Sequence, residues 1–215
     1  VPNPYAVHPG AYLTWHEPNR FGCTICHRGQ GSAIVFDEAK GVGYHWDYPL
    51  LPKEFTQASC GLCHSMDEIE GKGGELMAAG KVHFSEKGCQ ACHRLDGRGG
   101  NLGPILDGEG AKIPMQLPMA HVVGERSLPQ WLLEHFADPQ RVVVGSRMRP
   151  PHLDQEETMA LTAYMLSLQD RDLPGRYLSP GLHLAAWQRA NPESTSGEHL
   201  FDRFCASCHD TGRYG

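Results

Sequence analysis

The chain has 215 residues and a formal net charge of −6 at pH 7. It contains no cluster of lysine and arginine that could bind phosphates, which argues against a nucleic-acid partner. No stretch approaches the roughly 18 apolar residues of a membrane span. Because 25 residues are glycine and 16 are proline, we expect a loop-rich chain with a modest core of its own side chains.

All eight cysteines lie in Cys-x-x-Cys-His motifs. The motifs are Cys23-Thr-Ile-Cys26-His27, Cys60-Gly-Leu-Cys63-His64, Cys89-Gln-Ala-Cys92-His93 and Cys205-Ala-Ser-Cys208-His209. In such a motif both thiols form thioethers to a porphyrin and the histidine ligates its iron, so the pattern predicts four covalently bound c-type haems. A zinc site or a disulfide framework would explain the cysteines, but not a histidine at the same offset each time.

Residues 1–75 hold the first two motifs. The intervals around these motifs are too short for a complete one-haem domain, so we expect a loop-dominated dihaem module here. No methionine lies in a loop suited to ligating these irons, and we therefore expect histidines as the second ligands. The candidates are His16, for the neighbouring haem, and His45, for either haem, with His8 as the reserve. The usual role of a lone histidine, at the surface or in a hydrogen bond, is the alternative for each.

The interval between the third and fourth motifs is long enough for a complete domain. A helix is predicted to begin after Asp154 and to continue to about Leu168, because apolar residues recur there at helical spacing. The packing face consists of Leu161, Tyr164, Met165 and Leu168.

Residues 76–170 resemble a class I cytochrome c. The resemblance rests on four segments, which are Gly80-Lys-Val-His-Phe84 before the third motif, Asn101-Leu-Gly-Pro104-Ile-Leu106, Gln130-Trp131-Leu-Leu-Glu-His135-Phe136 and Val144-Gly-Ser-Arg-Met148-Arg-Pro150. At His83 the family usually has leucine.

This resemblance implies a mainly α-helical chain with extensive loops, built around a class I cytochrome c helical domain whose last helix crosses the first. It also implies that the Pro104 backbone helps to fix His93 and that Met148 is the sixth ligand of the third haem. A core role is the alternative for Met148. Met115 and Met119 are expected to pack rather than to ligate.

Residues 171–196 are rich in proline, glycine and serine and are predicted to be a linker. Residues 197–215 repeat the beginning of a cytochrome c domain, since Gly197-Glu-His-Leu-Phe201 precedes the fourth motif. We expect an incomplete second cytochrome c domain in which His209 ligates the iron. The sixth ligand would then come from downstream sequence or from a neighbouring subunit, which would make a homo-oligomer through the C-terminal haem.

Two N-terminal segments, 15–31 and 45–60, resemble parts of multihaem cytochromes linked with bacterial quinol-oxidising complexes. The resemblance implies an electron carrier with redox protein partners in a membrane complex, in the periplasm or otherwise outside the cytoplasm. A haem enzyme with one open iron, or a polymerising cytochrome filament, is the alternative. Arg28, Arg94 and Arg147 are candidates for contacts with haem propionates, against the default of an exposed arginine.

Overall fold

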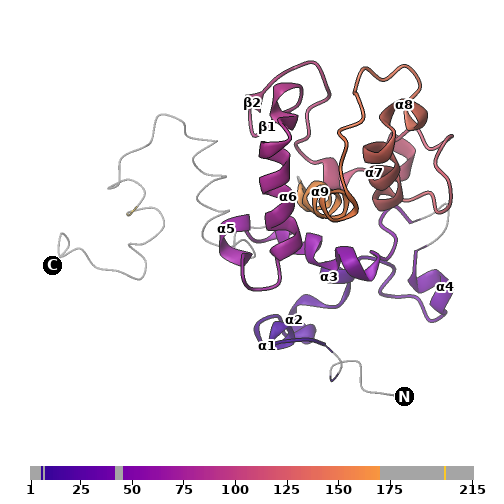
Figure 1. The fold of residues 1–215 in the computed structure, drawn as a ribbon. Coiled ribbons are helices and arrows are strands. Elements are labelled where there is room, and N and C mark those ends of the chain that lie inside the picture. The colour runs from indigo at the N-terminus through magenta and orange to yellow at the C-terminus, as the bar shows by residue number, and fades with distance from the viewer. Residues whose placement is uncertain (1–5, 7, 42–45, 170–200, 202–215) are drawn as a thin grey trace.

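The computed structural model describes residues 6, 8–41, 46–169 and 201 (Figure 1). The predicted linker at 171–196, the fourth motif and His45 lie outside the described residues. Within the described part the chain is mainly helical with long loops, as predicted, and its strands form one antiparallel pair. None of the helices described there has the length and apolar character needed to cross a membrane.

The elements are short except at the centre of the fold. The α-helices are α1 (Tyr12–Trp15), α2 (Pro18–Phe21), α3 (Thr24–His27), α4 (Phe36–Ala39), α5 (Met66–Ile69), α6 (Glu75–Glu86), α7 (Leu128–Ala137), α8 (Pro139–Val142) and α9 (Gln155–Ser167). The 3-10 helices are η2 (Lys53–Leu62), η3 (Cys89–Ala91), η4 (Glu109–Ala111) and η5 (Pro114–Gln116), and the strands are β1 (Arg94–Leu95) and β2 (Arg98–Gly99).

Helices α6 and α9 cross at the centre of the molecule (Figure 1). A Cβ atom at Gly80 would lie 2.1 Å from the backbone oxygen of Ala160 and 2.6 Å from Cβ of Tyr164. Glycine is therefore required for the two helices to approach this closely. The crossing of the first and last helices, which the family resemblance implied, is confirmed.

Helix α9 begins with a capping box, in which Asp154 accepts a hydrogen bond from the N–H of Glu157 at 2.8 Å and Glu157 accepts one from the N–H of Asp154 at 3.0 Å. The predicted helix is thus confirmed. The prediction of a single packing face on this helix was too narrow, because every residue from Ala160 to Ser167 is buried. The reason is that α9 packs against α6, α7 and η2 at once.

Helix α7 covers another side of α9 and brings Leu128, Trp131 and Leu132 into the core. The Ser127 hydroxyl accepts a hydrogen bond from the N–H of Gln130 at 3.4 Å at its start. The helix ends before Asp138, whose carboxylate accepts from the N–H of Arg141 at 3.1 Å and so caps α8.

The N-terminal module packs on the same core. Phe55 and Ala58 of η2 are fully buried and belong to one hydrophobic cluster with residues of α6, α7 and α9. A Cβ atom at Gly61 would lie 2.6 Å from the backbone oxygen of Ser167, so η2 touches the end of α9 directly. Residues on both sides of the expected boundary at 75/76 therefore share one core.

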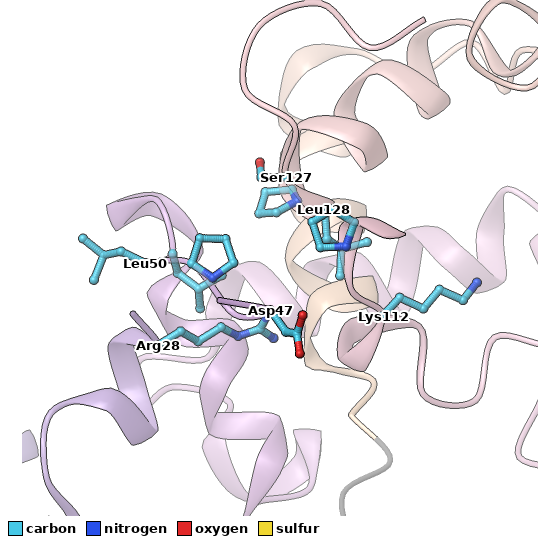
Figure 2. Close-up of a pocket in the computed structure, with 10 residues that line it drawn as sticks. Arg28, Asp47, Leu50, Lys112, Ser127 and Leu128 are labelled. Carbon is cyan, nitrogen blue, oxygen red and sulfur yellow. The ribbon is translucent and has the colours of Figure 1, made fainter. Parts of the chain in front are cut away.

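Arg28 also joins the two parts of the chain. It is 8% exposed, and its guanidinium donates a hydrogen bond of 2.9 Å to the backbone oxygen of Gly110. Figure 2 shows the small pocket at this junction, between the segment of Arg28, Asp47 and Leu50 and the segment of Lys112, Ser127 and Leu128. Its volume of about 10 Å³ suits one water molecule, so the junction is a packed contact rather than a substrate site.

Candidate functional site

The three described Cys-x-x-Cys-His motifs fold in the same way. In each, the backbone N–H of the histidine donates to the carbonyl oxygen of the first cysteine, at 3.0 Å for His27, 2.9 Å for His64 and 3.0 Å for His93. This bond closes one helical turn, which brings residues three and four apart onto one side of the backbone. Both thiols and the imidazole of a motif can therefore hold one haem.

The thiols are available for thioether formation. The six described cysteines, Cys23, Cys26, Cys60, Cys63, Cys89 and Cys92, are all free of disulfides. Among the described residues, no group of three or more His, Cys, Asp or Glu side chains is arranged to hold a metal ion by itself.

The third motif has the surroundings expected of a proximal haem ligand. Nδ1 of His93 lies 2.9 Å from the carbonyl oxygen of Pro104, so the Pro104 backbone does hold this ring. Such a bond leaves Nε2 free to ligate iron. A Cβ atom at Gly103 would lie 2.5 Å from Cε1 of His93, and one at Gly100 would lie 2.1 Å from the Ala91 carbonyl oxygen. The glycine-rich loop thus wraps closely around the motif.

Apolar side chains stand in solvent next to this motif. Leu102 is 67% exposed and Ile105 is 47% exposed, and both flank the Gly103-Pro104 contact with His93. Val144, at the start of the predicted ligand loop, is 77% exposed. A flat apolar group bound at His93 would cover Leu102 and Ile105, which is how the residues present fit a haem. Met148 lies half-buried in the same loop, where its N–H donates to Oγ of Ser146 at 3.2 Å.

Two other methionines differ in their surroundings. Met119 packs against the hydrophobic core, as expected. Met115 is 88% exposed, so its expected packing is absent from this structure.

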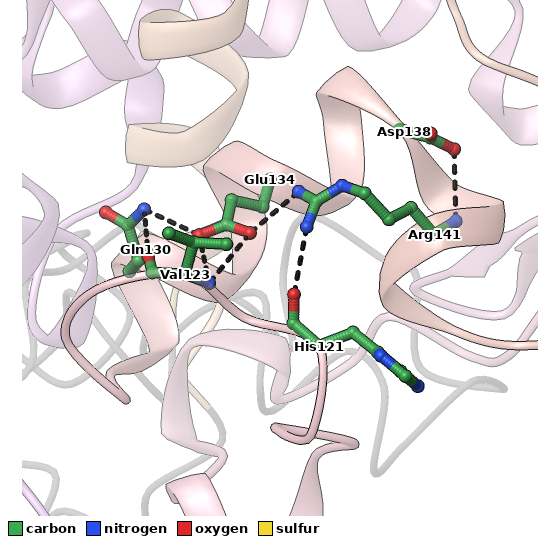
Figure 3. A network of polar contacts seen from close by, with 6 residues as sticks. All are labelled: His121, Val123, Gln130, Glu134, Asp138 and Arg141. Carbon is green, nitrogen blue, oxygen red and sulfur yellow. Dashed lines mark hydrogen bonds and ion pairs between the residues drawn. The ribbon is translucent and has the colours of Figure 1, made fainter.

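A polar network fixes the loop that leads into α7 (Figure 3). The largely buried Glu134 accepts hydrogen bonds from the N–H of Val123 at 2.9 Å, from Gln130 at 2.8 Å and from Arg141 at 2.7 Å. Burial raises the pKa of Glu134, but these three donors outweigh burial and hold the pKa below its usual range. Arg141 also donates to the backbone oxygen of His121 at 2.9 Å, so one arginine joins α8 to this loop.

The first two motifs lie beside each other, since α3 packs on η2. Burial, and then the nearby Cys26, raise the pKa of the Cys60 thiol to about 11, against the lowering effect of its own backbone hydrogen bond. Burial and Cys26 also raise the pKa of Cys63. The attachment thiols of one site are therefore close neighbours of those of the other.

Each motif histidine of this pair has a second imidazole beside it, in an edge-to-face contact. The ring centroid of His16 lies 6.0 Å from that of His64, and the ring centroid of His8 lies 5.9 Å from that of His27. Burial, and then His8, lowers the pKa of His27. Burial also lowers the pKa of His64, with Glu68 opposing and His16 adding to the effect. Both proximal rings are thus favoured in the neutral form that a metal ligand requires.

The structure places the remaining predicted residues as follows. His16 is beside the second motif, as expected for a ligand of the neighbouring haem, whereas His45, Cys205, Cys208 and His209 lie outside the described residues. Arg28 is buried and bonded to Gly110, while Arg94 and Arg147 are exposed.

Residues 77–169 match the model of the Cytochrome c family. This part of the chain is therefore a class I c-type cytochrome domain, which implies a covalent c-type haem and points to haem-based electron transfer. The comparisons with curated proteins and with solved structures found no match.

Proposed function

We propose that this chain is a tetrahaem c-type cytochrome that relays single electrons outside the cytoplasm. Cytochrome c domains are usually extracytoplasmic, which fits this location. The observation that carries the proposal is the shared local fold of the three described motifs, each with its histidine N–H bonded to its first cysteine. Residues 205–209 repeat the same motif and supply the fourth site.

The residues that hold the haems have distinct roles. The eight motif cysteines would anchor the porphyrins, and His27, His64, His93 and His209 would be the proximal ligands. When bound, each haem supplies an iron that exchanges one electron, and the chain positions it and tunes its potential. Each iron then needs a second ligand if it is to carry electrons rather than bind a substrate.

The second ligands differ between the sites. His16 would ligate the second iron, opposite His64, because its ring centroid already lies 6.0 Å from that of His64. The first iron would take either His45 or His8. Met148 would ligate the third iron, and a thioether raises the reduction potential relative to bis-histidine ligation. Electrons would then pass downhill from the N-terminal pair to the third haem.

Redox proteins are the proposed partners, as parts of a membrane-associated respiratory or photosynthetic complex. The net charge of −6 favours a basic docking face on such a partner. A second copy of this chain is also a proposed partner, through the C-terminal haem.

A redox titration with carbon monoxide as a probe tests the relay. We expect low-spin haems in two potential groups, with the third haem above the N-terminal pair, and no stoichiometric carbon monoxide binding at the three described sites. Binding of one carbon monoxide at any of these three haems after reduction would instead indicate an enzyme with an open iron.

A further inference from the structure

The short segment from His8 to His16 reaches both N-terminal haem sites. Its two histidines make edge-to-face ring contacts with the histidines of different motifs, His8 with His27 and His16 with His64. Helix α1 lies between them in the chain. The segment belongs to neither Cys-x-x-Cys-His motif and lies outside the matched cytochrome c domain.

The ring separations agree with ligation of a common iron. A metal–imidazole bond is about 2 Å long, so two imidazoles on opposite sides of one iron have ring centres about 6 Å apart. The observed distances are 5.9 Å and 6.0 Å. Ring contacts between aromatic side chains cover about 4.5–7 Å, and His16 makes such a contact with Phe21 at 5.5 Å. The feature that distinguishes the two histidine pairs is that each contains the proximal histidine of a haem motif.

The hydrogen bond of His16 supports the same role. Its Nδ1 lies 3.1 Å from the carbonyl oxygen of Tyr12, one turn earlier in the chain. An imidazole that donates from Nδ1 to a carbonyl presents the lone pair of Nε2, which is the usual arrangement of a metal-ligating histidine. His93 shows the same arrangement with Pro104, at 2.9 Å.

We propose that residues 8–16 form a ligand strap that supplies the second iron ligand of both N-terminal haems, His8 to the iron of His27 and His16 to the iron of His64. The proposal rests on the tetrahaem function proposed above, and it selects His8 over His45 for the first iron. Both irons then have two strong-field ligands and no open position. Loss of the strap would open two irons at once.

Glycine substitutions combined with added imidazole test the strap in the full, haem-loaded chain. We expect His8→Gly and His16→Gly each to convert one haem per chain from low spin to high spin, seen by electron paramagnetic resonance and by new carbon monoxide binding. Free imidazole should restore the low-spin signal, which it would not do for damage to folding. His121→Gly is the matched control, because this exposed histidine lies outside the strap, and it should change no spin state.

A second variant tests the role of His8 independently. His8→Met should keep the first haem low-spin but raise its potential and add one methionine–iron charge-transfer band. The proposal is overturned if His8→Gly keeps every haem low-spin at full haem content, or if His45→Gly, and not His8→Gly, opens the first iron. Absence of haem from the Cys23–His27 peptide of the unaltered chain would instead refute the tetrahaem function itself.

Discussion

Gly80→Ala should destabilise the protein, because the added methyl group has no space at the crossing of α6 and α9. It would lie 2.1 Å from the backbone oxygen of Ala160, and a backbone atom cannot rotate away as a side chain can. The two atoms must separate by roughly 1.3 Å to reach an ordinary contact distance of 3.4 Å. Overpacking of this kind costs about 1–3 kcal/mol, and backbone obstruction favours the upper end. About 1 kcal/mol of this cost is offset, because alanine has a higher helix propensity than glycine.

The expected net loss is about 2 kcal/mol in the free energy of unfolding, or a fall in Tm of about 4–8 °C for a chain of this size. Guanidinium unfolding of the haem-loaded protein measures it, with the midpoint shifting at constant slope. Ser85→Ala is the control, since Ser85 is exposed on the same helix and its substitution should be neutral or slightly stabilising. A Gly80→Ala protein as stable as the unaltered chain would refute the close crossing.

Met148→Ala should lower the reduction potential of one haem and abolish one methionine–iron charge-transfer band. Met115→Ala, at an exposed methionine, should change neither. An unaltered spectrum of the Met148→Ala protein would exclude Met148 as a ligand. Gly103→Ala should disturb that same haem by pushing on the His93 ring, and an unshifted potential would contradict the 2.5 Å contact. Arg28→Ala should lower the free energy of unfolding by about 1.5–3 kcal/mol, because a buried charged hydrogen bond to the backbone oxygen of Gly110 is lost. An unchanged free energy of unfolding would mean that this hydrogen bond does not hold the junction together.

Local patterns in the sequence predicted the local parts of the structure. Asp154 followed by Glu157 is a capping pattern within four residues, and the helix begins there. The motif histidines need only one helical turn, which Cys-x-x-Cys-His encodes by itself. The loop around Pro104 was predictable because its resemblance to a known family carries the contact with His93.

Contacts between distant segments could not be predicted in this way. The approach of Gly61 to Ser167 joins residues far apart in sequence, and nothing in either segment indicates the other. Packing against α6, α7 and η2 at once buries every residue from Ala160 to Ser167, although the periodicity of the sequence predicted one packing face.

The same limit applies to the proposed N-terminal ligands. His16 was predicted to serve the neighbouring haem from its position before Cys23, and its ring does lie beside His64. His8 remained a reserve, because only the fold shows that its ring lies beside His27.

Mass spectrometry of haem-bearing peptides from the purified chain tests the tetrahaem assignment most directly. We predict one haem mass on each of four peptides, those with Cys23 and Cys26, Cys60 and Cys63, Cys89 and Cys92, and Cys205 and Cys208. A haem on the Cys89–His93 peptide alone, with unmodified thiols in the other three, would contradict the assignment and leave a single cytochrome c domain.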